Sequence, residues 1–318
     1  MSRGRIDTHH HVVPPFYKEA LERGKGDPSG SWTPTWTLAE DDKFSSTLGI
    51  STTIFSLTAP GPDTLEGEGA AKLARQTNEY LASLRDENPS RYGFFAAMPT
   101  LTNTSAALAE IAYALDELKA DGVTLFTRYG EGHTYLGHAD LIPIWKALND
   151  REAVVFIHPT HAVDTTLVAP NLPQPITDYP HETTRAAVHL IASNTLKEHA
   201  SKCKIILSHA GGTLPYIANR VTALPDVGML DKSREEILAE IGSFYFDLAL
   251  SSSQETIQLL LHYTTPDHLL FGSDYPYAPP KLVTRFAEML DKADLGDEIQ
   301  RLINSENALK LFPRLRKA

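Results

Sequence analysis

The sequence predicts a single α/β domain over residues 1–318, folded as a (β/α)8 TIM barrel with an insertion after the first strand. Short apolar runs alternate with longer amphipathic stretches, which is typical of parallel strands joined by crossover helices. Eight such pairs fit into the chain, and both the count and the length match the barrel. The alternative is an open doubly wound sheet, but no Gly-x-Gly-x-x-Gly follows the first apolar run.

The expected elements can be assigned in order. We expect strands at 4–9, 51–57, 93–98, 122–127, 153–158, 204–209, 244–249 and 269–274. Helical patterns occupy 70–87, 105–120, 139–149, 182–201, 233–241, 253–263, 281–292 and 297–311. Two long stretches rich in Gly, Pro and Thr follow the first and fifth strands, at 12–44 and 159–181. Because barrel sites are built by the loops that follow the strands, we expect these two stretches to cap the site.

The composition is that of a globular protein with an acidic balance. Hydrophobic residues make up 42% of the chain, and the formal net charge is −11. Nucleic acids and anionic membranes require a basic surface, so neither is an expected partner. The single cysteine, Cys203, excludes an internal disulfide and a thiolate metal site. No apolar stretch reaches the ~18 residues of a membrane span and the first residues lack a signal-peptide core, so we expect a cytoplasmic protein.

Two histidines close the first predicted strand. Side chains alternate along a strand, so His9 and His11 point the same way, with Cα atoms ~7 Å apart. That spacing allows two imidazoles to bind one ion. His10 must point the other way, and we expect its removal to leave metal and activity intact.

Three further polar residues close other strands. His158 ends the fifth predicted strand, His209 the sixth and Asp274 the eighth. The carboxyl ends of barrel strands meet at one mouth, so His158 and Asp274 can reach the point where the first two imidazoles converge. Three imidazoles and one carboxylate suit Zn²⁺ or another borderline divalent ion, with one position left for water or substrate.

Four motifs resemble those of a known family. They are IDTHHH at 6–11, FIHP at 156–159, SHAGG at 208–212 and FGSDYP at 271–276. Together they resemble the amidohydrolase superfamily, and more narrowly its decarboxylase branch, which includes aminocarboxymuconate semialdehyde decarboxylase and γ-resorcylate decarboxylase. The resemblance extends over nearly the whole chain. It implies a (β/α)8 barrel with one divalent ion, Zn²⁺ as the first choice and Mn²⁺ as the alternative.

The resemblance also implies roles for individual residues. His209 is implied to be catalytic. The implied metal ligands are His9, His11, His158 and Asp274. Binuclear hydrolases of the superfamily carry a bridging lysine at the end of the fourth strand, whereas residues 125–128 read LFTR here. A two-metal hydrolase is therefore disfavoured.

The implied reaction is the nonoxidative decarboxylation of a small aromatic acid. A general acid would protonate the ring carbon that bears the carboxylate, and we assign Asp274 to this step, with His209 assisting. The rival from the same fold is a mononuclear metal-dependent hydrolase of a lactone or an amide. A rival of another class is a noncatalytic barrel that stores or senses metal.

The insertion suggests a substrate. Residues 26–30 (GDPSG), Trp32, Trp36 and residues 55–61 (FSLTAPG) look like the fungal 6-methylsalicylate decarboxylase branch. This likeness implies a salicylate such as 6-methylsalicylate. The two tryptophans would then form an aromatic wall over the ring, the alternative being that they only pack the loop.

Arg220 is the candidate for binding the substrate carboxylate. It lies eleven residues beyond His209, and in the semialdehyde decarboxylase the arginine at the matching place reaches in from the neighbouring subunit. If the segment is helical, residue 220 lies ~16 Å from the metal of its own chain. We therefore expect a homodimer or a higher homo-oligomer in which Arg220 serves the neighbouring site, with a surface or intrachain ion pair as the alternative.

Overall fold

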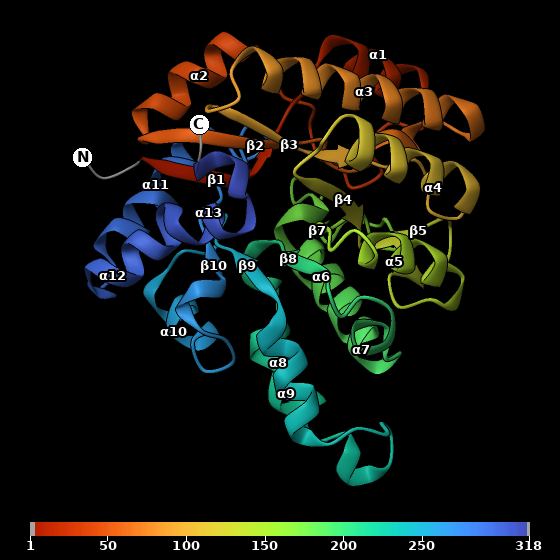
Figure 1. Ribbon diagram of the computed structural model, residues 1–318, viewed down its shortest axis with the longest axis vertical. Coiled ribbons are helices and arrows are strands. Elements are labelled where there is room, and N and C mark those ends of the chain that lie inside the picture. Colours follow the sequence, from red (N-terminus) through yellow and green to blue (C-terminus); the bar gives the residue numbers. More distant parts are fainter. Residues whose placement is uncertain (1–3, 317–318) are drawn as a thin grey trace.

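The chain folds into an eight-stranded parallel barrel surrounded by helices, as predicted (Figure 1). This computed structural model describes residues 4–316, so residues 1–3 and 317–318 of the expected domain lie outside it. Each strand of the barrel pairs with the next one along the chain. The strands are β1 Arg5–His11, β2 Ile50–Ser56, β3 Tyr92–Ala97, β4 Gly122–Phe126, β7 Val154–His158, β8 Lys204–Leu207, β9 Tyr245–Asp247 and β10 Leu269–Leu270. The short strands β5 (Arg128–Tyr129) and β6 (Thr134–Tyr135) form a separate antiparallel pair.

The segment after β10 closes the barrel against β1. Regular strand geometry ends at Leu270, so the eighth predicted strand, 269–274, is wrong in its last four residues. The following residues still run beside β1, because Thr8 N donates a hydrogen bond to Phe271 O at 3.0 Å. Asp274 N donates to His9 O at 2.8 Å, and Asp274 has a left-handed φ of 62°. This pairing places the carboxylate of Asp274 beside the histidines of β1.

Helices cover the outside of the barrel. They are α1 Pro15–Arg23, α2 Leu38–Thr47, α3 Gly67–Glu87, α4 Thr104–Ala112, α5 Ile142–Asn149, α6 Gln174–Ala192, α7 Thr195–His199, α8 Leu214–Val221, α9 Arg234–Ser243, α10 Gln254–Leu260, α11 Pro280–Lys292, α12 Gly296–Arg301 and α13 Asn307–Leu311. In α11 the buried residues Val283, Ala287 and Leu290 recur at helical spacing and face the barrel. Within residues 4–316 no helix has the length and apolarity needed to cross a membrane.

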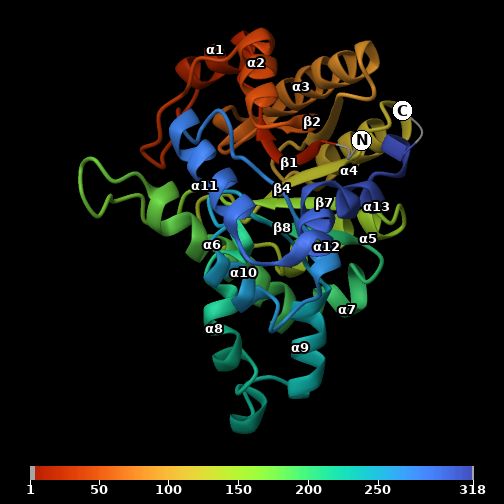
Figure 2. The same cartoon turned by 90° about the vertical axis from the view of Figure 1, so that its left-hand side faces the viewer.

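The two stretches expected to be loops contain helices. Residues 12–44 include α1 and the first part of α2, which begins after Thr37, whose side chain accepts from Glu40 N at 3.2 Å. Residues 159–181 end in the first turns of α6, and the loop before α6 extends away from the barrel in Figure 2. The sequence pattern also missed α8, which projects with α9 as an arm from the barrel (Figure 1).

An apolar layer fills the barrel beneath the site. It combines side chains from six strands, Ile6, Ile54, Phe95, Phe156, Ile206 and Leu270. Phe312 and Leu315 of the C-terminal segment close this layer at the amino ends of the strands. The His9 ring packs edge-on against Phe156, with the ring centroids 5.0 Å apart. The apolar layer therefore packs directly against the histidine side chains at the carboxyl ends of the strands.

An irregularity in β1 decides which histidines face inward. Ile6 lies in the interior layer, so strict alternation would direct His9 outward. The pairing of β1 with β2 shifts register between Asp7 and His10. Such a bulge re-aims the side chains that follow it, and His9 and His11 both face the interior.

Candidate metal centre and active site

Four side chains of the predicted site come together at the carboxyl ends of the strands. His9 Nε2 lies 3.1 Å from His11 Nε2, and Asp274 Oδ1 lies 3.1 Å from His11 Nε2. The four ligand atoms are all within 4.8 Å of one another. We call this group the His₃Asp cluster; it consists of His9, His11, His158 and Asp274.

The outward hydrogen bonds of the three imidazoles orient them for metal binding. His9 Nδ1 is 3.0 Å from Asp247 Oδ2, and His158 Nδ1 is 2.8 Å from Pro159 O. Since a carboxylate and a carbonyl only accept, each Nδ1 carries the proton. His11 Nδ1 is 2.8 Å from Ser56 Oγ, whose own proton goes to a backbone carbonyl. All three Nε2 atoms therefore face inward, and in the neutral imidazoles their lone pairs point to one place, an arrangement that a bound cation stabilises.

The charges around the cluster also favour a cation. Burial, together with neighbouring His11 and His9, lowers the pKa of His158 well below its ordinary value and keeps it neutral. Burial would lower the pKa of His9 too, but the carboxylates of Asp247 and Asp274 raise it to about 10, so these acids favour a positive charge at Nε2 that a metal ion would supply in place of the second ring proton. Burial opposes ionisation of Asp274, yet the charge of His9 and hydrogen bonds from the histidines hold its pKa well below the usual range. The residues present thus fit one divalent ion.

His209 stands beside the cluster on a strained turn. It follows the end of β8 rather than closing the strand, and its φ is 53°. Its Nε2 lies 3.4 Å from Asp274 Oδ2, while its Nδ1 is buried without a hydrogen-bond partner among the described residues. Gly212 follows, and a Cβ there would meet Pro180 O at 2.0 Å, so only glycine fits this turn. The strain holds an imidazole with a free nitrogen at the edge of the cluster.

Asp247 is a site residue that the sequence reasoning missed. It ends β9, is fully buried, and accepts from His9 through Oδ2. Its Oδ1 accepts from His209 N at 3.3 Å, so one carboxylate positions both a ligand and the neighbouring turn. An isolated acid in the apolar run FYFDLA was the available signal, but the predicted strand at 244–249 placed it in the middle of the strand.

His10 faces away from the cluster, as predicted, but it is not a free side chain. Its Nδ1 is 2.9 Å from Asp7 Oδ2, and its Nε2 is 2.8 Å from Asp41 Oδ2. Trp36 Nε1 donates to the same Asp41 oxygen at 2.6 Å. Burial would lower the pKa of His10, but Asp41 and Asp7 raise it to about 10. A buried cation between two carboxylates therefore connects α2 to the metal strand.

We predict that His10→Ala lowers the free energy of unfolding by about 3–5 kcal/mol, because it leaves Asp7 and Asp41 buried without their cation. Urea unfolding of the variant measures this loss. His181→Ala, which removes an exposed imidazole from α6, is the matched control and should unfold like the wild type. A wild-type midpoint for His10→Ala would contradict the buried ion network.

A cavity of about 400 Å³ opens onto the cluster. His158, His209 and Asp274 line it, and most of the other lining side chains are apolar or aromatic. Trp32 lies on its wall, whereas Trp36 is buried against Asp41, so only one of the two tryptophans can contact a substrate ring there. Among the described residues that line this cavity, none is lysine or arginine.

Arg220 does not reach the cavity of its own chain. It is exposed on α8, beyond the short turn that contains His209. The exposed apolar residues Tyr216, Val227 and Met229 lie on the same projecting arm. The structure therefore separates Arg220 from the other predicted site residues.

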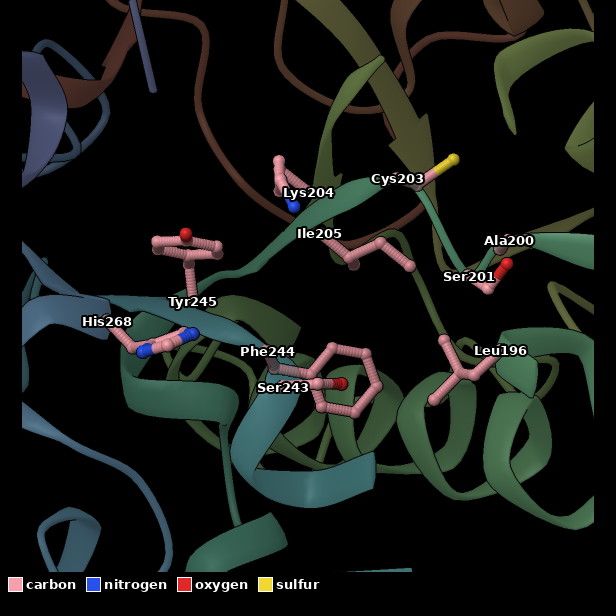
Figure 3. Close-up of a pocket in the computed structure, with 10 residues that line it drawn as sticks. All are labelled: Leu196, Ala200, Ser201, Cys203, Lys204, Ile205, Ser243, Phe244, Tyr245 and His268. Carbon is pink, nitrogen blue, oxygen red and sulfur yellow. The ribbon is translucent and has the colours of Figure 1, made fainter. Parts of the chain in front are cut away.

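A smaller cavity of about 210 Å³ lies at the opposite end of the barrel (Figure 3). It is bordered by α7 and by the amino ends of β8 and β9, and includes Lys204, Tyr245 and the half-buried Cys203. Burial raises the pKa of the Cys203 thiol to about 12. None of its lining residues belongs to the His₃Asp cluster.

Comparison with known proteins identifies the family. The family model described as Amidohydrolase matches residues 6–314. The chain is 51% identical to the 6-methylsalicylic acid decarboxylase of Penicillium expansum, over 98% of this chain and 97% of that one. It is 50% identical to the 6-methylsalicylic acid decarboxylase of Aspergillus aculeatus, over 99% and 97%. A solved amidohydrolase II structure superposes with a TM-score of 0.89 at 28% identity, covering 97% of this chain and 99% of that one.

The chain therefore belongs to the amidohydrolase family. Within that family it falls in the decarboxylase branch, as the four sequence motifs indicated.

Proposed function

We propose that the protein is a nonoxidative decarboxylase of salicylates, that 6-methylsalicylate is its substrate, and that the His₃Asp cluster binds one divalent cofactor ion. The observation that carries this proposal is the opening of the cluster into a cavity with aromatic and apolar walls. A flat apolar ring fits such walls, and its charged end would face the cluster. The two fungal relatives, which match nearly the full chain, support the choice of substrate.

The ligand set of three imidazoles and one carboxylate favours Zn²⁺, with Mn²⁺ as the alternative. When bound, the ion would orient the substrate and balance the charge of its carboxylate and phenolic oxygens as a Lewis acid. The cavity lining offers no other cation among the described residues. Metal analysis of the purified protein distinguishes the two ions.

The cytoplasmic location expected from the sequence stays a prediction.

Asp274 of the cluster and His209 beside it would handle the proton. Because Asp274 is ionised in the resting site, it takes up a proton through His209 and then donates that proton to the ring carbon that bears the carboxylate, which interrupts the aromaticity and weakens the bond to the carboxylate. The bond then breaks, its electron pair returns to the ring, and carbon dioxide leaves. His209, with Nε2 3.4 Å from Asp274 Oδ2, is placed to restore the proton to Asp274. General acid–base catalysis of this kind accelerates a reaction by about 10²–10⁴-fold.

Product analysis in heavy water tests the reaction. Metal-loaded protein with 6-methylsalicylate in D₂O should release carbon dioxide and 3-methylphenol in equal amounts. The phenol should carry one deuterium at the carbon that held the carboxylate. Hydrolysis of lactones or amides without carbon dioxide release would favour the rival hydrolase, and stoichiometric metal without any turnover would favour a storage protein.

We further propose that the protein forms at least a homodimer in which Arg220 contacts the substrate carboxylate of the neighbouring subunit. Arg220 is exposed on the projecting α8–α9 arm together with apolar side chains that a second subunit could cover. The cavity lacks a basic side chain among its described lining residues, and the planar guanidinium matches a carboxylate.

Mixing two inactive variants tests the shared site. Arg220→Ala and His209→Ala should each be nearly inactive, and a mixture should recover about one quarter of the wild-type rate, because half of the dimers are mixed and each has one complete site. Mass measurement confirms subunit exchange. If the subunits exchange but activity does not recover, Arg220 acts within its own chain or does not act at the site.

A further inference from the structure

Asp27 is an ionisable residue of the cavity that the proposed reaction does not use. It lies in the insertion between α1 and α2 and lines the same cavity as His158, His209 and Asp274. Asp27 therefore adds a carboxyl group to a cavity lining that already contains Asp274 of the cluster.

The position of Asp27 is fixed by the loop around it. Ser29 N donates to Asp27 Oδ1 at 2.9 Å, and Ser29 itself is fully buried. Ser29 O accepts in turn from Gln174 N at 2.9 Å, which fastens the insertion to the start of α6. The carboxyl group is consequently held in the wall and is not carried on a mobile side chain.

Among the described residues, neither lysine nor arginine lines the cavity next to Asp27. Its neighbours include the phenols Tyr17, Tyr179 and Tyr277; burial raises the pKa of each, and the negative charge of Asp27 adds to this rise. Burial also raises the pKa of Asp27, although hydrogen bonds from Ser29 oppose this rise. A second carboxylate on the substrate ring would thus meet a like charge, with no lysine or arginine in the described lining to neutralise it.

We propose that Asp27 is a specificity-determining residue that restricts the cavity to aromatic monocarboxylates. Its charge excludes a second carboxylate from the ring. Discrimination thus comes from repulsion of the wrong ligand as well as attraction of the right one. This inference rests on the proposed binding of a salicylate in the cavity.

Binding measurements on metal-loaded, full-length protein test Asp27 independently of turnover. The probes are 6-methylsalicylate and three salicylates with an added carboxylate, namely 3-hydroxyphthalate, 2-hydroxyterephthalate and 4-hydroxyisophthalate. Asp27→Asn keeps the shape and the acceptor for Ser29 N but removes the charge. We expect it to improve the affinity for at least one dicarboxylate, relative to 6-methylsalicylate, by about tenfold to a hundredfold. The dicarboxylate that gains most identifies the ring position that faces Asp27.

Two further variants complete the test. Ser31→Lys places a cation in the same wall without touching Asp27, and it should also admit a dicarboxylate. Glu22→Gln removes one exposed charge from α1, and its affinity ratios should equal those of the wild type. Unchanged ratios in both Asp27→Asn and Ser31→Lys would overturn the proposal, as would weaker 6-methylsalicylate binding in Asp27→Asn without any gain for a dicarboxylate.

The failure of this inference and the failure of the proposed function give different results. If wild-type protein releases carbon dioxide from 6-methylsalicylate but the affinity ratios do not change, the decarboxylase assignment stands and the role of Asp27 falls. If the ratios change but no carbon dioxide forms, Asp27 still selects monocarboxylates and the proposed reaction falls.

Discussion

Replacing His158 or Asp274 with alanine is expected to remove the bound metal and the activity together. The three imidazole Nε2 atoms and one carboxylate oxygen of the His₃Asp cluster lie within 4.8 Å of one another, so each supplies one of four ligands. Loss of an outer hydrogen-bond partner typically weakens metal binding about 10–100-fold, and loss of a ligand should cost at least as much. The metal content of the purified variants should fall to near zero at micromolar protein concentration, with no turnover above background.

A matched control separates ligand loss from general damage. His181→Ala removes an exposed imidazole from α6 and should retain both metal and rate. Elemental analysis and initial rates on the same samples provide both readouts, and circular dichroism verifies the fold. Full metal occupancy in Asp274→Ala would remove Asp274 from the set of ligands. Its proposed role as proton donor would then need a separate test.

His209→Ala is expected to keep the bound metal, while its kcat falls by about 10²–10⁴-fold. Its Nε2 lies 3.4 Å from Asp274 Oδ2, which is close enough to exchange a proton with Asp274 but is not needed to complete the four-residue cluster. Removing it should therefore leave the ion in place and slow the proton step. The variant should also respond to added imidazole, which can restore part of the lost rate by occupying the vacated space.

For His209, the decisive experiment measures the metal content and the reaction rate of the same variant. Elemental analysis should give wild-type occupancy in His209→Ala, in contrast to His158→Ala. A wild-type rate in the His209 variant would end its assignment as a catalytic residue. Simultaneous loss of metal and rate would make it a structural support of the cluster, since Asp247 connects its backbone to His9.

Much of the architecture follows from local pattern. Eight apolar runs separated by amphipathic stretches predicted the barrel, and β1 to β4 and β7 agree with the expected strands to within a residue or two. This succeeds because a strand buried in a parallel sheet must be apolar on both faces, and its covering helix must be apolar on one. The ends of the shorter strands were less predictable. β10 has two residues where six were expected, because pairing with β1 continues there through irregular backbone.

By itself, the sequence determined the chemical types of the site residues and the strands that deliver them. His158, His209 and Asp274 follow apolar runs, His9 and His11 lie at the end of the first predicted strand, and in a barrel the carboxyl ends of strands meet. Only the tertiary structure decided how they are oriented. The bulge in β1 turns His9 inward, Asp247 fixes its tautomer, and the left-handed turn at Asp274 brings the carboxylate beside them. Each of these features depends on hydrogen bonds between residues far apart in the chain, and local periodicity carries no information about such pairs.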